Sequence, residues 1–134
     1  MSSAVRRLLR VLAMATTLAP VSVAAGEVIA HPSVDISAAE VRDVFLGERQ
    51  WSGDLKLVPV DNLAAHDHFL ARVLQTDSPK YAARWLRKSF REGLAAPPMK
   101  GSDSEVIEFV KATRGAIGYL SSPSTAGVKV LGRF

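Results

Sequence analysis

The sequence has 134 residues, a formal net charge of +4 and no cysteine. The lack of cysteine excludes disulfides, thiolate nucleophiles, iron–sulfur clusters and cysteine zinc sites. Three of the 17 basic residues and none of the 13 acidic residues precede residue 26, so residues 26–134 carry a net charge of only +1. This balance does not favour a nucleic-acid-binding protein, which needs basic residues concentrated on one surface. A chain of this length supplies one hydrophobic core and hardly two.

Residues 1–25 have the order of parts that is typical of a cleavable secretory signal. Three arginines open the segment, an apolar stretch runs to Ala25, and its last residues are small enough for a signal peptidase. A membrane anchor is the alternative, but Arg10, Thr16 and Pro20 interrupt the roughly 20 apolar residues that a span needs. We therefore expect export to the periplasm and no membrane span in residues 26–134. The arginine pair at 6–7 leaves the twin-arginine and general export routes open.

The chain from residue 27 to residue 60 predicts a strand, a helix and a second strand. Residues 27–31 are a short β-rich run, and residues 55–60 alternate as a half-buried strand does. Between them, Ser37 and Glu40 fit a capping box, in which a serine hydroxyl and a glutamate satisfy free amides at a helix start. Gly47 stands where a helix would end. The apolar residues at helical spacing in this helix are Val41, Val44 and Phe45.

Three more helices are predicted in residues 62–112. Asn62 can cap the first of them, Ser78 and Pro79 form a strong start for the second, and Ser102 with Glu105 forms another capping box for the third. In the first helix, the residues expected to face the core are Phe69, Leu70, Val73 and Leu74. In the second they are Ala82, Leu86 and Phe90, with Tyr81 and Trp85 beside them. In the third they are Val106, Ile107, Phe109 and Val110.

Two short strands, residues 116–120 and 128–131, are predicted to close the chain. Strands that alternate with helices indicate an α/β domain, here a small mixed sheet covered by about four helices. No repeat, linker or low-complexity segment divides the sequence, so residues 26–134 form one predicted domain.

Two polar patterns are candidates for binding. The turn at residues 101–105 combines a helix start with two serines and could hold an oxyanion, although simple capping explains the same residues and Asp103 would repel an anion. A basic stripe on one face of the helix predicted to start at Ser78 could meet an acidic partner, a lipid headgroup or an anion, or be a solvated surface. The stripe consists of Arg84, Arg87, Lys88 and Arg91.

The sequence favours neither a metal site nor an enzyme. His66 and His68 lie two residues apart, which places them on nearly opposite sides of a helix, and His31 is distant in sequence. Helical metal ligands are usually three or four residues apart. No nucleophile elbow and no phosphate-cradling glycine loop occurs. We therefore expect a non-enzyme without a cofactor.

Two segments together resemble a known family. Residues 37–47, with the run Phe-Leu-Gly at 45–47, and then Trp51 and the strand to Val60, look like the start of the second lobe of periplasmic phosphate ABC transporter substrate-binding proteins. Residues 101–106 and the Gly-Ala-Ile-Gly-Tyr run at 115–119 are similar to a later helix and strand of the same family. Order and spacing agree over most of residues 27–121. The resemblance implies a type 2 periplasmic-binding fold, no enzymatic activity and an oxyanion ligand.

The sequence departs from this family in two ways. Family members clamp the ion between two lobes, whereas residues 26–134 have room for little more than one. Their second lobe carries an Arg-Ser-Asp-x-Ser-Gly-Thr loop that holds phosphate, but residues 61–68 contain no arginine and no hydroxyl, and two carboxylates. A desolvated phosphate needs charge-assisted donors, so tight phosphate binding in the family's manner is not expected.

Two hypotheses follow for the function. In the first, the domain binds phosphate or another small anion weakly, and the resemblance places two helix starts near the cleft, which gives Asn62, His66, Ser102 and Ser104 as candidate ligand residues. In the second, the lobe has no ligand and binds an envelope protein through Arg84, Arg87, Lys88 and Arg91.

Overall fold

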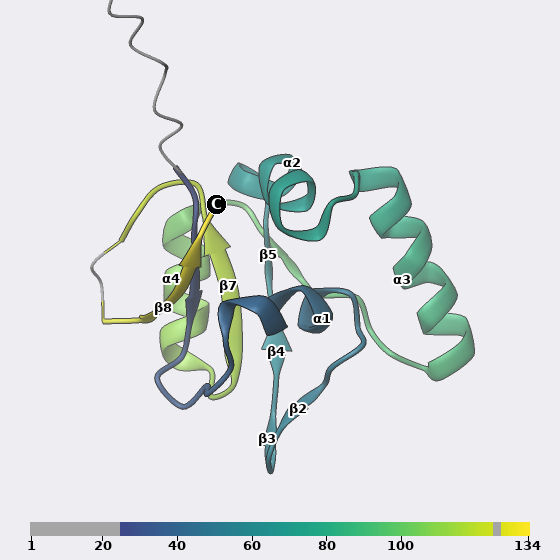
Figure 1. The fold of residues 1–134 in the computed structure, drawn as a ribbon, viewed down its shortest axis with the longest axis horizontal. Coiled ribbons are helices and arrows are strands. Elements are labelled where there is room, and N and C mark those ends of the chain that lie inside the picture. The colour runs from purple at the N-terminus through teal and green to yellow at the C-terminus, as the bar shows by residue number, and fades with distance from the viewer. Residues whose placement is uncertain (1–24, 125–126) are drawn as a thin grey trace, which may run out of the picture.

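A four-stranded mixed sheet forms the centre of the computed structural model, which describes residues 25–124 and 127–134 (Figure 1). Its strands, in spatial order, are β4 (Val58–Pro59), β7 (Ala116–Leu120), β1 (Glu27–Ala30) and β8 (Lys129–Arg133). β4 runs parallel to β7, while β7 and β8 both run antiparallel to β1. Two separate pairs complete the strands: the hairpin of β2 (Trp51–Ser52) with β3 (Leu55–Lys56), and the parallel pair of β5 (Asp61–Asn62) with β6 (Met99–Lys100). The predicted secretory signal, except for Ala25, lies outside the described residues.

Helices cover both faces of this sheet. The α-helices of the described chain are α1 (Val41–Phe45), α2 (His66–Phe69), α3 (Ser78–Glu92) and α4 (Asp103–Ala112). Short 3₁₀ turns, η2 (Ala38–Glu40) and η3 (Leu63–Ala65), lead into α1 and α2, and a π-helical turn, η4 (Leu70–Leu74), continues α2. α4 packs on one side of the sheet, α1 and α2 lie on the other, and α3 stands at the far end (Figure 1). The predicted α/β domain with a small mixed sheet and about four helices is confirmed.

Two hydrophobic clusters hold the layers together. The smaller one joins α4 to the sheet, and its fully buried members are Ile29, Val60, Val106, Val110, Ala116 and Leu120. The larger one lies under α1 and α2 and contains a group of aromatic rings. Phe69 stacks on Tyr119 with ring centroids 3.8 Å apart, and the rings of Phe45 and Phe134 meet Phe69 edge-on at 4.9 and 5.4 Å. Such ring pairs add stability beyond the area that they bury.

The glycines of the Gly-Ala-Ile-Gly-Tyr run are required by packing. Gly115 has a φ of +83°, and a Cβ there would lie 2.1 Å from the carbonyl oxygen of Lys56. A Cβ on Gly118 would lie 2.6 Å from a methyl of Val106, because α4 approaches β7 closely at this point. The run that carries the family resemblance is therefore explained by the fold, without any ligand.

Side-chain caps begin the helices much as the sequence predicts. The carboxylate of Glu40 accepts the backbone N–H of Ser37 at 2.8 Å, and the hydroxyl of Ser102 accepts the N–H of Glu105 at 3.3 Å. The start of α3 differs from the prediction by one residue. Asp77, not Ser78, is its N-cap, and its carboxylate accepts the N–H of Lys80 at 2.9 Å. Aspartate and serine are equally good caps, so sequence preference alone could not separate them.

The predicted strand at residues 55–60 is divided into two short pieces, β3 and β4, and a third piece, β5, follows directly after it. The N–H groups along it bond to different partners: that of Leu57 to Gln50, that of Val58 to Gly115, and that of Asp61 to Pro98. Pro59 has no N–H to donate, which weakens any continuous ladder. The segment thus passes from the hairpin to the sheet and then to β6, which places Asp61 and Asn62 at a corner of the fold.

The predicted inner face of α3 is wrong. Ala82 is exposed, and the side chains of Leu86 and Phe90 are 60% and 84% exposed, whereas Tyr81 and Trp85 are buried. Apolar residues occupy two neighbouring stripes of this helix, and hydrogen bonds decide which stripe faces inward. The hydroxyl of Tyr81 donates to Asp61 at 2.9 Å, and the indole N–H of Trp85 donates to the carbonyl of Phe45 at 3.1 Å.

Candidate functional site

A polar cluster lies where the parallel strands β4 and β7 end. The chain continues from β4 into Asn62, from β7 into Ser121 and Ser122, and α4 starts beside them at Asp103. We call these four residues the strand-end cluster. In open α/β sheets, ligands usually bind beyond the carboxyl ends of the strands. The strand-end cluster is therefore where an inherited ligand site would be sought.

The carboxylate of Asp103 binds the donors of this cluster. Its Oδ1 accepts the amide of Asn62 at 2.7 Å and the backbone N–H of Ser121 at 2.9 Å. Its Oδ2 accepts the hydroxyls of Ser121 at 2.7 Å and of Ser122 at 3.3 Å. Partial burial acts to raise the pKa of Asp103, but the hydrogen bonds from Ser121, Asn62 and Ser122 outweigh it and lower the pKa below its usual value. The protein thus supplies its own anion at this position.

Asn62 has no hydrogen left to offer a ligand. Its Oδ1 accepts the N–H of Ala64 at 3.0 Å, which caps η3 as the sequence predicts. Its Nδ2 donates to Asp103 and to the carbonyl oxygen of Tyr119 at 2.9 Å. A side-chain amide has two donor hydrogens, and both are used. The residue is also fully buried, at 0% exposure.

A second buried carboxylate, Asp61, lies behind the cluster. It is 3% exposed and accepts two phenol hydroxyls, from Tyr81 and Tyr119, both at 2.9 Å. Burial raises the pKa of Asp61, while the two tyrosine hydroxyls and the nearby His66 act in the opposite direction. Nδ1 of His66 lies 3.0 Å from the same Tyr119 hydroxyl. The network joins α2, α3, β5 and β7.

The four candidate ligand residues lie near the same corner of the fold but do not share a cavity wall. Asn62 and His66 both contact Tyr119, the first at its carbonyl and the second at its hydroxyl. Ser102 caps α4, and its hydroxyl lies 3.1 Å from that of the exposed Ser104. The assignment of these residues to ligand binding stays a prediction.

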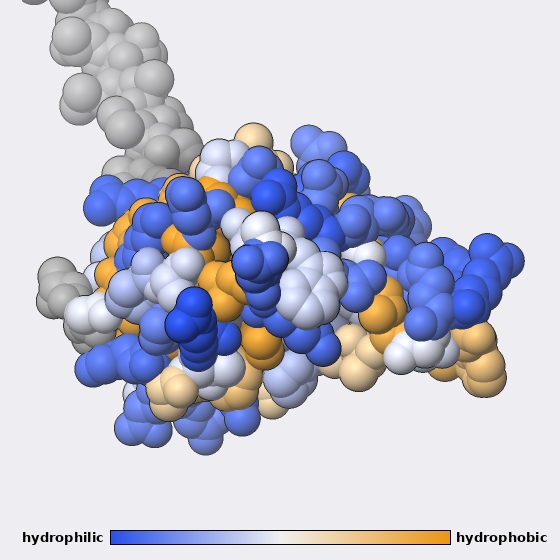
Figure 2. Space-filling model, turned by 90° about the horizontal axis from the view of Figure 1, so that it is seen from below, coloured by the Kyte–Doolittle hydropathy of each residue, from blue (hydrophilic) through white to orange (hydrophobic). Residues whose placement is uncertain are grey.

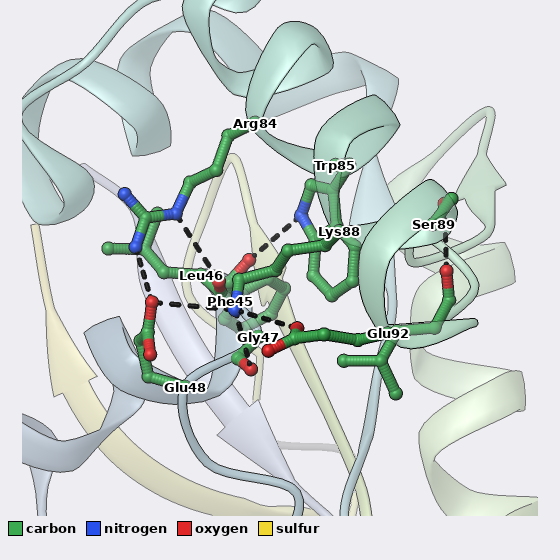
Figure 3. A network of polar contacts seen from close by, with 10 residues as sticks. Phe45, Leu46, Gly47, Glu48, Arg84, Trp85, Lys88, Ser89 and Glu92 are labelled. Atoms are coloured by element: carbon green, nitrogen blue, oxygen red, sulfur yellow. Dashed lines mark hydrogen bonds and ion pairs between the residues drawn. The ribbon is translucent and has the colours of Figure 1, made fainter.

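The basic stripe of α3 divides into two pairs. Arg84 and Lys88 turn towards the end of α1, where Nε of Arg84 lies 3.4 Å from the carbonyl of Leu46 and Nζ of Lys88 lies 3.3 Å from that of Gly47 (Figure 3). Both also pair with the carboxylate of Glu48, at 2.5 and 3.5 Å. Cations at a helix C-terminus satisfy free carbonyls and the helix dipole. Arg84 and Lys88 therefore anchor α3 to α1.

Arg87 and Arg91 form the other pair and are exposed. They flank the stripe of α3 that carries Ala82, Leu86 and Phe90. We call these five residues the outer face of α3. Figure 2 shows hydrophobic and hydrophilic residues side by side at this end of the molecule. A groove of about 450 Å³ runs beside the outer face and is lined by Leu86, Met99 and Pro97, among others, with Asp61 and His66 also contributing to its lining.

The histidines of the described chain do not converge on a metal position. His66 contacts Tyr119, the ring of His68 lies 5.3 Å from that of Phe134, and Nδ1 of His31 lies 2.7 Å from the hydroxyl of Ser33. Within residues 25–124 and 127–134, no three histidine or acidic side chains form a group that could hold a metal ion. In the same residues, no helix is both long enough and apolar enough to cross a membrane.

Sequence reasoning missed the part played by Asp103 and Asp61. An acidic residue in the first turn of a helix is a common capping choice, so Asp103 gave no signal of its contacts with Asn62 and Ser121, which are distant in sequence. Asp61 follows an apolar strand directly, and a carboxylate at that position could have indicated a buried polar network. Its partners, Tyr81 and Tyr119, lie 20 and 58 residues away.

A scan against models of protein families found no match, and a search of curated proteins found none either.

Solved structures share the fold. A phosphate ABC transporter substrate-binding protein from Clostridium perfringens, solved with bound phosphate, matches 80% of this chain with a TM-score of 0.50 and 16% identity. The protein PstS from Borrelia burgdorferi matches 81% with a TM-score of 0.53 and 19% identity. The match spans 44% and 46% of those two chains. The described chain therefore has the fold of a little under half of a phosphate-type solute-binding protein.

Proposed function

We propose that this chain is an exported lobe of solute-binding type that works in the periplasm as an interaction module, through the outer face of α3. Its partner is an envelope protein with an acidic surface that also offers an apolar side chain. The proposal follows the second of the two hypotheses drawn from the sequence, but of its four contact residues it keeps only Arg87 and Arg91, because Arg84 and Lys88 contact the end of α1. It also retains the predicted secretory signal, so the exported protein would begin at residue 26.

One observation carries the proposal: the donors at the strand ends already bind the carboxylate of Asp103. An incoming oxyanion would have to displace a negative charge that four hydrogen bonds hold in place. An oxyanion that used the same donors would lie close to the carboxylate of Asp103. Two negative charges that close together repel strongly in a partly buried site. With the strand-end donors already used, another surface of the lobe is the better candidate for a binding site.

The outer face of α3 supports the choice of contact surface. Phe90 and Leu86 are among the most exposed large apolar side chains of the described residues. Aromatic and arginine side chains are the residues that most often dominate the binding energy of protein interfaces. Here Phe90 stands beside Arg87 and Arg91, and the adjoining groove could accept an apolar side chain from the partner.

Weak phosphate binding at Asn62, His66, Ser102 and Ser104 is the competing function. It is supported by the likeness in fold to proteins whose names include phosphate. At 16% and 19% identity that likeness extends to the fold alone. The engaged amide of Asn62 and the charge of Asp103 both weaken this hypothesis.

Site-specific photo-crosslinking in cells would test the contact surface. A crosslinker at position 90 should form an adduct with one envelope protein, and Arg87→Glu with Arg91→Glu should abolish that adduct. Position 63 is the matched control, because Leu63 is also exposed, at 65%, but lies outside α3. Equal adducts from positions 90 and 63, or an adduct that survives the charge reversal, would contradict the proposal. The mass of the periplasmic protein should correspond to residues 26–134.

A calorimetric titration of residues 26–134 with phosphate, with sulfate as the control anion, tests the competing function. If the candidate ligand residues bind phosphate, Ser102→Ala with Ser104→Ala should remove a phosphate-selective heat. We expect that pair of substitutions to leave any such heat unchanged. A loss of heat in the pair would favour the first hypothesis instead.

A further inference from the structure

A pocket of about 290 Å³ lies between α1, the end of η4 and the first turns of α3. Four basic side chains and no acidic one line it: Arg42, Lys80, Arg84 and Arg87. Gln75, Thr76, Tyr81, Leu46 and Leu74 complete the lining. We call it the α1–α3 pocket. None of the strand-end cluster belongs to it, and Arg42 is not part of the outer face of α3.

The protein neutralises two of these four cations and leaves the other two without an acidic partner. Arg84 pairs with Glu48, and Lys80 pairs with Asp77 at 3.7 Å through two exposed side chains. Neither Arg42 nor Arg87 takes part in any ion pair of the described residues, and all 13 acidic residues are among those described. Two positive charges are thus left over in one small volume. The chain from residue 26 on carries only +1 in total, so this concentration is local.

Holding like charges together without a counter-ion is unfavourable, and the cost falls when an anion binds between them. The donors present suit an oxyanion. Two guanidinium groups can each offer a pair of parallel N–H bonds, and the hydroxyl of Thr76 lies in the same wall. The volume equals that of roughly ten water molecules, which admits a phosphoryl or sulfuryl group together with a few further atoms.

We propose that the α1–α3 pocket binds an oxyanion carrying two or more negative charges, held chiefly by Arg42 and Arg87. The group can belong to a free small molecule or to a lipid headgroup, since both present the same oxygens. Binding would join α1 to the first turns of α3 through the anion. The site shares Arg87 with the proposed partner contact, but Arg42 and the rest of its lining lie outside the outer face of α3.

Calorimetric titration of residues 26–134 with inorganic pyrophosphate tests the site. We expect saturable heat in 50 mM salt that weakens as the salt concentration rises. Arg42→Gln should weaken binding about tenfold, because one charge-assisted contact is lost. Arg42→Gln with Arg87→Gln should abolish the heat. Arg114→Gln is the control, since Arg114 is an exposed arginine outside the pocket.

A second measurement distinguishes the source of the anion. Flotation with phosphatidylcholine vesicles, with and without phosphatidic acid, would show binding to a headgroup. Heat with pyrophosphate assigns the pocket to a free anion. No heat, together with flotation that requires phosphatidic acid and is lost in Arg42→Gln, assigns it to a headgroup. Neither heat nor such flotation, or binding that Arg42→Gln with Arg87→Gln leaves intact, would overturn the proposal. Arg42→Gln should not change the crosslinks from position 90, so the two proposals can fail separately.

Discussion

The strand-end cluster and the α1–α3 pocket differ in the sign of their charge and in whether the protein itself supplies partners for the charged groups. At the strand ends, one carboxylate, Asp103, is surrounded by donors from Asn62, Ser121 and Ser122, and all of them belong to the protein. In the pocket, Arg42 and Arg87 have no carboxylate partner among the described residues. A carboxylate whose oxygens are filled by the protein's own donors contributes to folding, whereas cations without a partner are available to a ligand. The place where the fold leads one to expect an anion is thus the poorer of the two candidates.

The largest expected effect comes from breaking the strand-end cluster. Asp103→Ala removes one of the two acceptors of the buried Asn62 amide and leaves one of its N–H groups without a partner. The substitution should lower the free energy of unfolding by about 1–3 kcal/mol. Urea denaturation measures the change. Glu108→Ala, on an exposed part of the same helix, is the control and should change stability by less than about 0.5 kcal/mol. A small effect of Asp103→Ala would mean that the cluster is not a structural unit.

A smaller effect is expected from pH, and it should have opposite signs for the two carboxylates near the strand ends. The pKa of Asp61 is raised by burial, so its contribution to stability is complete below the pKa of the unfolded chain, about 3.9, and is lost as pH rises through the folded pKa. The pKa of Asp103 is lowered, so its contribution is present above about 3.9 and is lost as pH falls through the folded pKa.

Carbon-detected NMR titration of the two carboxyl groups would check these signs directly. Asp61 should titrate above the ordinary range and Asp103 below it. Asp61→Asn should remove the decline in stability above pH 4. The loss of stability at lower pH, which comes from Asp103, should stay unchanged. Two carboxyl groups that titrate together in the ordinary range would contradict the difference drawn here between them.

The smallest effect concerns the α1–α3 pocket. Gln75→Glu adds a carboxylate of nearly the same shape to the pocket wall, beside unpaired cations. It should raise the free energy of unfolding by up to about 1 kcal/mol at low salt, and the gain should disappear in concentrated salt. The same substitution should weaken pyrophosphate binding, since an internal anion would then compete. A destabilising effect at low salt would mean that the cations of the pocket are already compensated.

Local sequence signals were enough to predict most of the fold. Capping residues such as Ser37 and Ser102 act within one turn, and the strand at residues 116–120 is observed as Ala116–Leu120. The glycines at 115 and 118 explain why the family-like run could be recognised although overall identity to the solved structures is low. These features depend on neighbours in the chain or on close approaches that only glycine allows.

Features set by distant contacts could not be predicted in the same way. Which face of α3 turns towards the core depends on the hydrogen bonds from Tyr81 to Asp61 and from Trp85 to Phe45. The spacing of apolar residues along the helix does not predict these bonds. The basic stripe was one feature in sequence but became two, because the end of α1 binds Arg84 and Lys88 and leaves Arg87 exposed. Which of these basic residues stay available to a ligand or another protein depends on which of them find a partner within the fold. Tertiary packing decides this.

The pairing of β1 with β8 has a mechanical consequence. Gly26 and Phe134 exchange two backbone hydrogen bonds, of 2.9 and 3.0 Å, so the two ends of the described chain lie side by side. A force that draws these two ends apart would open the antiparallel pair like a zipper, one pair of bonds at a time, rather than shear the whole sheet. The ring of Phe134 would be withdrawn early from the aromatic group around Phe69. Under tension the domain should therefore yield first at this seam, while α3, at the opposite end, stays packed against α1 (Figure 1).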